Sequence, residues 1–310
     1  MIGNFKIIRS TKLKIKNKNY DNNTAGYLFV LPALIFMVAL VGYPIIYNII
    51  ISFQKVDLFT FINPQKEFVG FKNYVDIFQD GLVTKALTNT LIFTIGSIIF
   101  QFVIGFGLAL FFANNFKLAE FLRGLNLVAW MIPMVAVAAI FKWMFAGSYG
   151  IINHLLISIG FIKEPIEWLA YPNTAMMVVI ITNIWKGIPF NMLLLATALT
   201  NMPKDVYEAA NIDGTSKFQE FTYITLPLLK SAILAVLTLG FIYTFKVFDL
   251  VYAMTGGGPA YSTELLSTLS YRYSFGQNNF SYGAAVANIL FVILFMFGLF
   301  YLRLTSKEEI

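Results

Sequence analysis

The chain alternates between long apolar runs and shorter polar segments. Six of the runs are long enough to cross a bilayer, because a spanning helix needs about 20 residues. Only helices and closed barrels cross a bilayer, and runs of this length predict helices. The sequence therefore predicts an all-α, polytopic membrane protein. Its six transmembrane helices cover about 27–53, 86–113, 121–145, 174–199, 229–254 and 282–302. Four prolines in or near the runs are predicted to kink helices: Pro32, Pro44, Pro133 and Pro189.

Composition and charge agree with this class and give the helices a direction. Apolar residues make up 58% of the chain and charged residues 12%, whereas a soluble domain has about 25% charged residues. Basic residues gather just before the first run, which predicts a cytoplasmic amino terminus. Six spans return the carboxyl terminus to the same side, so 114–120 and 200–228 are predicted inside and 54–85, 146–173 and 255–281 outside. The basic residues are Lys6, Arg9, Lys12, Lys14, Lys16 and Lys18 before the first run, with Arg303 and Lys307 after the last.

The sequence excludes several kinds of chemistry. It has no cysteine, so disulfides, thiolate metal sites and thiol catalysis are ruled out. It shows no triad spacing, metal motif or carboxylate pair, which argues against an enzyme. The net charge of +6 does not indicate nucleic-acid binding, because the basic residues do not form a patch beside aromatic residues.

The polar segment between the fourth and fifth runs has the clearest local signals. Pro203 suits a first helical turn, and Gly214 suits the left-handed position after a helix end. Ser216 and Gln219 fit a capping box that starts a second helix, and Pro227 is predicted to end it. A polar helix pair has no lipid to bury against, so we expect it to dock on another protein. A generic helical hairpin is the alternative.

Several motifs together resemble one family. Glu208-Ala209-Ala210 followed by Asp213-Gly214 resembles the EAA signature of permease subunits of binding-protein-dependent ABC importers. Thr215 departs from the alanine usual there. The resemblance covers about 27–303, and its other motifs point to the carbohydrate branch, with maltose-type and glycerol-phosphate-type permeases. These motifs are Phe68-Val69-Gly70, Asn73-Tyr74, Asn89-Thr90, Trp185 to Phe190, Phe221, Ile224, Leu226, Pro227, Phe248-Asp249 and Thr255 to Pro259.

The resemblance implies a type I importer permease with a cytoplasmic coupling-helix loop. Residues 1–26 would be a basic cytoplasmic segment and 27–85 the first helix with its outer loop. Residues 86–303 would be the type-1, MetI-like permease core, and 304–310 a cytoplasmic tail. The protein would lie in the cytoplasmic (inner) membrane of a prokaryote and carry a sugar or oligosaccharide.

The resemblance also implies partners. The EAA pair would sit in a groove of an ATP-binding subunit, with Glu208 as the central contact and Gly214 as the hinge. The sequence has no Gly-Lys dipeptide and hence no phosphate-binding loop. ATP and magnesium would be bound by the partner ATPase, with no cofactor in this chain. A homologous permease (a heterodimer), two ATP-binding subunits and an extracytoplasmic solute-binding protein complete the expected importer.

Two short sets of residues, each on one face of a predicted helix and called a stripe below, are candidates for the substrate pathway. By the resemblance, Lys186, Gly187 and Phe190 lie on the span before the EAA loop. Gly240, Tyr243, Thr244 and Val247 lie on the span after it, at one-face spacing. Thr244 and Val247 replace the amides of maltose-type cavities, which argues against maltose itself. Helix–helix packing is the alternative, because interfaces in lipid also favour small residues.

Charged residues inside spans are candidates for function. We expect water and substrate in a cavity, or an acidic partner, to compensate Lys186. Lys246 and Asp249 are three residues apart, and we expect them to pair on one helix face. The Thr255–Pro259 turn is predicted to be a hinge, with contact to a binding protein as a weaker alternative.

The sequence is also compatible with other functions. The permease could carry glycerol-phosphate or another acidic carbohydrate. A stand-alone secondary transporter or channel is disfavoured by the docking segment and by the lack of paired acidic residues in mid-span.

Overall fold

The computed structural model describes residues 22–62, 65–113 and 116–305. The basic amino-terminal segment and most of the predicted tail lie outside the described residues. The chain divides into two units, 1–48 and 49–310. Helix α1 (Asn22–Met37) lies in the first unit and continues through a π-helical turn (Val38–Gly42) into α2 (Tyr43–Ser52), whose last four residues belong to the second unit. This stretch has the length and composition of a membrane span.

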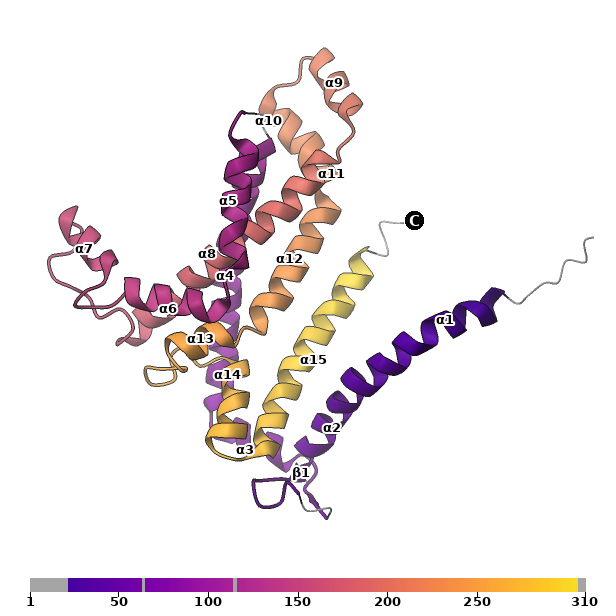
Figure 1. Ribbon diagram of the computed structural model, residues 1–310, viewed down its shortest axis with the longest axis vertical. Helices are drawn as coiled ribbons and strands as arrows, with labels where there is room; N and C mark the ends of the chain where they lie inside the picture. The colour runs from indigo at the N-terminus through magenta and orange to yellow at the C-terminus, as the bar shows by residue number, and fades with distance from the viewer. Residues whose placement is uncertain (1–21, 63–64, 114–115, 306–310) are drawn as a thin grey trace, which may run out of the picture. The chain divides into compact units, whose positions relative to one another are not determined.

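The second unit is almost entirely helical, with one short hairpin of strands β1 (Gln54–Lys55) and β2 (Glu67–Phe68) (Figure 1). Its helices are α3 (Lys72–Gln79), α4 (Leu82–Ala113), α5 (Ala119–Met131), α6 (Met134–Met144), α7 (Ile151–Ser158), α8 (Pro172–Thr200), α9 (Lys204–Ile212), α10 (Lys217–Gln219), α11 (Leu226–Leu228), α12 (Lys230–Phe245), α13 (Asp249–Met254), α14 (Leu266–Tyr271) and α15 (Phe280–Thr305), with π-helical turns at Glu220–Thr225 and Arg272–Gly276.

Within the described residues, five helices are long and apolar enough to span a membrane, or six if α5 and α6 count as one bent span. The predicted third span is therefore not one straight helix: α5 and α6 meet at an angle of 95°. Ile132 and Pro133 at the break have extended backbone angles. The proline ring keeps the preceding residue out of the helical conformation and removes a backbone donor, which explains the break.

The fifth span also differs from the prediction. One 29-residue helical stretch runs from Lys217 to Phe245 and passes through Pro227, which was expected to end the helix. The π-helical turn before Pro227 accommodates the proline: the Leu226 N–H bonds to the carbonyl of Phe221, five residues back.

The outer end of the fifth span is shorter than predicted. The helix stops at Phe245 because the N–H of Val247 turns back to the carbonyl of Thr244 at 3.1 Å. The break separates Lys246 from Asp249, and these two side chains do not form the expected ion pair in the described structure. The Lys246 ammonium instead lies 5.3 Å from the ring centroid of Tyr243.

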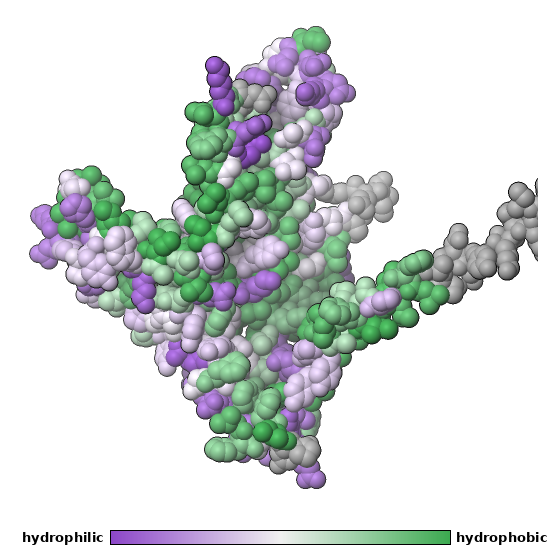
Figure 2. All heavy atoms as spheres, in the orientation of Figure 1, coloured by the Kyte–Doolittle hydropathy of each residue, from purple (hydrophilic) through white to green (hydrophobic). Residues whose placement is uncertain are grey.

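Helix α4 packs along α8, and α12 contacts both α4 and α8 (Figure 1). The contact between α4 and α8 is close because Gly105 faces Asn191 and the backbone of Met192. Figure 2 shows hydrophobic side chains along these helices and hydrophilic ones gathered around α9. The arrangement places the breaks after α5 and after α12 beside the middle of α8, where the predicted substrate residues lie.

Candidate functional site

The break between α5 and α6 is occupied by the side chain of Lys186 from α8. Its ammonium donates to the carbonyl oxygens of Ala129 at 3.3 Å, Trp130 at 2.5 Å and Ile132 at 2.6 Å. These carbonyls lie at the end of α5, where the helix leaves them without backbone donors. The lysine is 9% exposed. The charge is thus compensated by helix-end carbonyls, which sequence reasoning did not consider.

A cavity of about 320 Å³ lies beside this break, between α8 and α12. All seven residues predicted for the substrate pathway line it. Six of them come from α8 and α12 and Val247 from the break after α12, so the two stripes face each other across one space. The seven are Lys186, Gly187, Phe190, Gly240, Tyr243, Thr244 and Val247.

Aromatic rings form part of the cavity wall. The ring of Phe190 stacks on Trp130 at 5.8 Å and meets Tyr243 edge-on at 5.7 Å, measured between centroids. A methyl group at Gly240 would meet no atom within 4 Å beyond its own helix and chain neighbours, so the glycine leaves room for a ligand. Flat faces beside open space suit the C–H surfaces of a sugar ring.

Sequence reasoning missed five other lining residues, three of which carry amides: Gln101, Asn183 and Asn191. The Gln101 amide donates to the carbonyl of Asn183 at 2.8 Å, and the Asn191 amide donates to that of Gly187 at 2.9 Å. The side-chain nitrogen of Asn183 is buried without a hydrogen-bond partner. The cavity wall thus contains amides, although Thr244 and Val247 carry none. The presence of these amides in apolar spans was the available signal. The two other residues are Trp130 and Met134.

The segment between α8 and α12 has the predicted local structure. Gly214 follows α9 with a φ of +73°. Ser216 and Gln219 form the capping box at the start of α10. The backbone N–H and the hydroxyl of Thr215 both donate to the carbonyl of Ala210, at 3.1 and 2.8 Å. The threonine that departs from the family pattern therefore closes the turn.

The predicted coupling residues divide between two faces of α9. Ala210 is buried, and Tyr207 bonds to Thr225 at 3.1 Å, which holds α9 against the π-helical turn. Glu208, Ala209, Asp213 and Gly214 are exposed. Ile212, beside them, is 86% exposed. The exposed surface combines two carboxylates with small and apolar residues, which suits docking on a protein.

Residues 101–306 match the family of binding-protein-dependent transport system inner membrane components. The chain belongs to this family. The predicted resemblance to permeases of binding-protein-dependent importers is confirmed, and so is the predicted all-α fold with several spanning helices.

Relatives and a solved structure agree with the family. The trehalose/maltose transport system permease protein MalF of Thermococcus litoralis is 34% identical, over 92% of this chain and 94% of the relative. The sulfoquinovosyl glycerol transport system permease protein SmoG of Agrobacterium fabrum is 33% identical, over 91% of this chain and 90% of the relative. A crystal structure of a bacterial ABC transporter that imports alginate has a similar fold. Its TM-score is 0.78 at 23% identity, over 93% of this permease and 96% of that chain.

The loop after α13 is held by the start of α4 in this permease. The Asn89 amide donates to the carbonyls of Tyr261 and Glu264 at 3.0 and 3.1 Å. The Glu264 carboxylate is fully buried and pairs with Arg272 at 2.7 Å. A side chain at Gly257 would clash with this carboxylate, so the position requires glycine. The Asn89-Thr90 and Thr255–Pro259 motifs thus belong to one structural unit.

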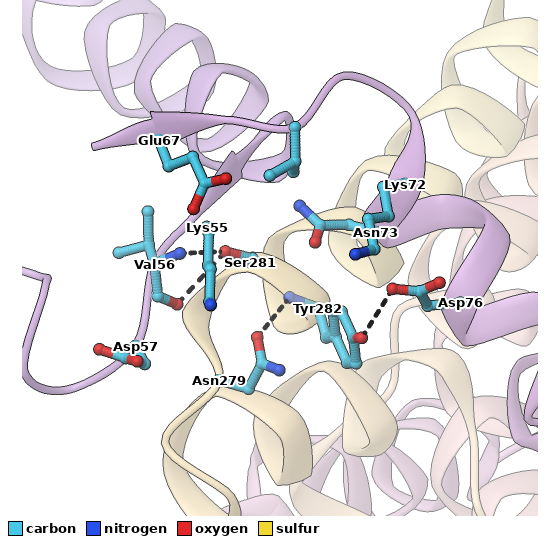
Figure 3. A pocket seen from close by; sticks show the side chains of 11 residues that line it. Lys55, Val56, Asp57, Glu67, Lys72, Asn73, Asp76, Asn279, Ser281 and Tyr282 are labelled. Carbon is cyan, nitrogen blue, oxygen red and sulfur yellow. Dashed lines mark hydrogen bonds between the residues drawn. The ribbon is translucent and has the colours of Figure 1, made fainter.

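A polar pocket of about 210 Å³ lies where the hairpin, α3 and α15 meet (Figure 3). Val56 and Ser281 exchange hydrogen bonds, and Asn279 accepts from the N–H of Tyr282. The Tyr282 hydroxyl donates to Asp76 at 3.1 Å. These bonds fasten the hairpin and α3 to α15. No group of three or more acidic or histidine side chains within the described residues could hold a metal ion.

Proposed function

We propose that this permease carries a saccharide across the cytoplasmic membrane as part of an ATP-driven importer, with the α8–α12 cavity as the passage. The observation that carries the proposal is the cavity wall, which joins the rings of Trp130, Phe190 and Tyr243 to the amides of Gln101 and Asn191. Rings pack on the C–H faces of sugars and amides bond to their hydroxyls. The named substrates of the relatives support a carbohydrate.

The partners follow from the same proposal. A second permease would complete the passage, and an extracytoplasmic binding protein would deliver the sugar. One of the two ATP-binding subunits would dock on the exposed face of α9 and the turn after it, through Glu208, Ala209, Asp213 and Gly214, with both termini of this chain on its side of the membrane. ATP and magnesium would be bound by those subunits. Nucleotide-driven closure would then reach the cavity through the continuous helix from Lys217 to Phe245.

Uptake by the assembled importer tests the proposal. Proteoliposomes with all subunits and the binding protein are given labelled trehalose, maltose, sulfoquinovosyl glycerol or alginate oligosaccharides. We expect ATP-dependent uptake of at least one, and about two- to tenfold slower uptake by Phe190→Ala and Tyr243→Ala, which remove rings worth about 0.5–1.5 kcal/mol each beyond their buried area. Tyr149→Ala, an exposed ring outside the cavity, is the control. Failure to take up any saccharide would contradict the proposal.

An acidic carbohydrate is the second candidate. The Lys246 ammonium lies over the Tyr243 ring, and none of the twelve residues that line the cavity carries a carboxylate. Lys246→Met should then slow uptake of sulfoquinovosyl glycerol or alginate oligosaccharides more than that of trehalose. An equal effect on acidic and neutral sugars would favour a neutral substrate.

A further inference from the structure

Four aromatic rings follow one another outside the cavity, on α13, α14 and the residues that flank them. We call Phe248, Tyr252, Tyr271 and Phe275 the outer aromatic row. Phe248 lies 5.1 Å from both Tyr252 and Tyr271, these two lie 5.0 Å apart, and Tyr271 lies 4.9 Å from Phe275, between centroids. Tyr252 is 48% and Phe275 63% exposed. The row is therefore not part of the buried core.

The row borders a cleft of about 450 Å³ with polar groups on its other sides. Tyr252, Tyr271, Thr268 and Arg272 line it together with two glycines. The Arg272 guanidinium is fixed by two bonds to Glu264, at 2.7 and 3.0 Å, and by one to the carbonyl of Gly256 at 2.7 Å. The cleft therefore offers ring faces next to a rigid donor group.

The Tyr271 hydroxyl keeps its proton at physiological pH. Hydrogen bonding with Tyr252 raises the pKa of Tyr271 above its ordinary value, and the proximity of the second phenol acts in the same direction. Each of the two tyrosines presents a flat apolar face and a hydroxyl to the cleft.

The row begins one residue after the cavity wall. Val247 lines the cavity, and Phe248 is the next residue. The hydroxyl of Ser267, the second residue of α14, donates to the Val247 carbonyl at 2.5 Å and so joins α14 to the cavity wall. A ligand that left the row at Phe248 would therefore arrive at the cavity wall.

We propose that the cleft between Tyr252, Tyr271 and Arg272 is a second saccharide-binding subsite, which holds the sugar outside the cavity before it enters. The inference rests on the proposed function. Saccharides fit this chemistry because they present apolar C–H faces to rings and hydroxyls to a guanidinium and phenols. A lipid chain would contact the ring faces alone and would offer no hydroxyl to the guanidinium or the phenols.

Cysteine labelling in the assembled importer tests where the sugar binds. Because the chain has no cysteine, Tyr252→Cys reports only its own surroundings. The probe is whichever sugar the native importer takes up from the panel above. We expect a soluble maleimide to label Tyr252→Cys and the sugar to slow labelling several-fold. Tyr149→Cys, a distant exposed position, should label at the same rate with or without sugar. No labelling of Tyr252→Cys would mean that another subunit covers the row, and unprotected labelling would mean that no sugar binds there; either overturns the proposal.

Uptake kinetics provide the second measurement. Tyr271→Ala and Tyr252→Ala should raise the half-saturating concentration of the sugar-loaded binding protein about three- to tenfold, as expected for the loss of one stacking ring, with the maximal rate nearly unchanged. Tyr271→Phe keeps the ring and should stay within about twofold of the native value. Native uptake with unchanged half-saturation in both alanine variants would overturn the subsite alone. Absence of native uptake would overturn the proposed function instead.

Discussion

The ammonium nitrogen of Lys186 lies 2.5 Å from the carbonyl oxygen of Trp130, across the break that Pro133 makes between α5 and α6. It also donates to Ala129 and Ile132. The end of a helix carries partial negative charge, which favours a cation there. The lysine thus replaces the backbone donors that the broken helix lacks, and it fixes the wall of the cavity at the same time.

The first prediction concerns this contact. Lys186→Met leaves carbonyls at the end of α5 without donors, and each such group costs about 1–3 kcal/mol. We therefore expect a lower melting temperature in detergent as well as slower uptake. Lys142→Met, an exposed lysine on α6, is the matched control and should melt like the native chain. A fully stable Lys186→Met would show that these carbonyls find other donors.

The second prediction concerns the contact between α4 and α8. A methyl group at Gly105 would lie 2.6 Å from the Cβ of Asn191 and 3.1 Å from the backbone nitrogen of Met192. The backbone of Met192 cannot shift easily, so Gly105→Ala should destabilise the permease by about 1–3 kcal/mol. Gly107 on the same helix has no such neighbour within 4 Å, and Gly107→Ala should be neutral or stabilising. Equal melting temperatures for the two variants would contradict the close contact between α4 and α8 at Gly105.

The third prediction concerns the exposed face of α9. Glu208→Lys reverses the charge at the proposed contact with the ATPase, and we expect stimulation of ATP hydrolysis and uptake to be lost. Because the side chain is exposed, the melting temperature of the isolated permease should not change. Glu164→Lys reverses an exposed acid on the loop predicted outside and should leave coupling intact. Normal uptake and co-purification of Glu208→Lys with the ATPase would refute the docking assignment.

The fourth prediction concerns Tyr273 after α14, whose hydroxyl donates to Asp80 at 3.2 Å. Burial, together with the negative charge of Asp80, raises the pKa of this phenol above its ordinary value. The unfolded chain then loses the proton near pH 10 while the folded chain keeps it. Stability is complete below about pH 10 and falls as the pH rises further.

Denaturation of the native chain and of Tyr273→Phe between pH 8 and 11 provides the measurement. The substitution removes the titrating group, so the stability of Tyr273→Phe should fall less steeply with rising pH than that of the native chain. Lysines titrate in both proteins and cancel in the comparison. Parallel curves would show that Tyr273 ionises equally in the folded and unfolded chains.

The sequence determined the features that depend on neighbouring residues. The lengths of the apolar runs predicted five of the helices long enough to span a membrane, since a bilayer sets that length, whereas the third run forms α5 and α6. Gly214 and the capping box at Ser216 predicted the turn after α9, because turn and cap geometry are local. One-face spacing placed Gly240, Tyr243 and Thr244 on one stripe of α12, because helical periodicity is also local.

Tertiary structure decided the features that join distant segments. Pro133 indicates a kink, but the 95° angle depends on what packs around α5 and α6. The partners of Lys186 lie more than 50 residues away on α5 and its end, and the amide of Gln101 reaches the cavity from α4. The expected pair of Lys246 and Asp249 is absent because α12 ends at Phe245. Residue spacing predicts a face of a helix only while the helix continues, and which helices face each other is set by packing between segments that no local pattern records.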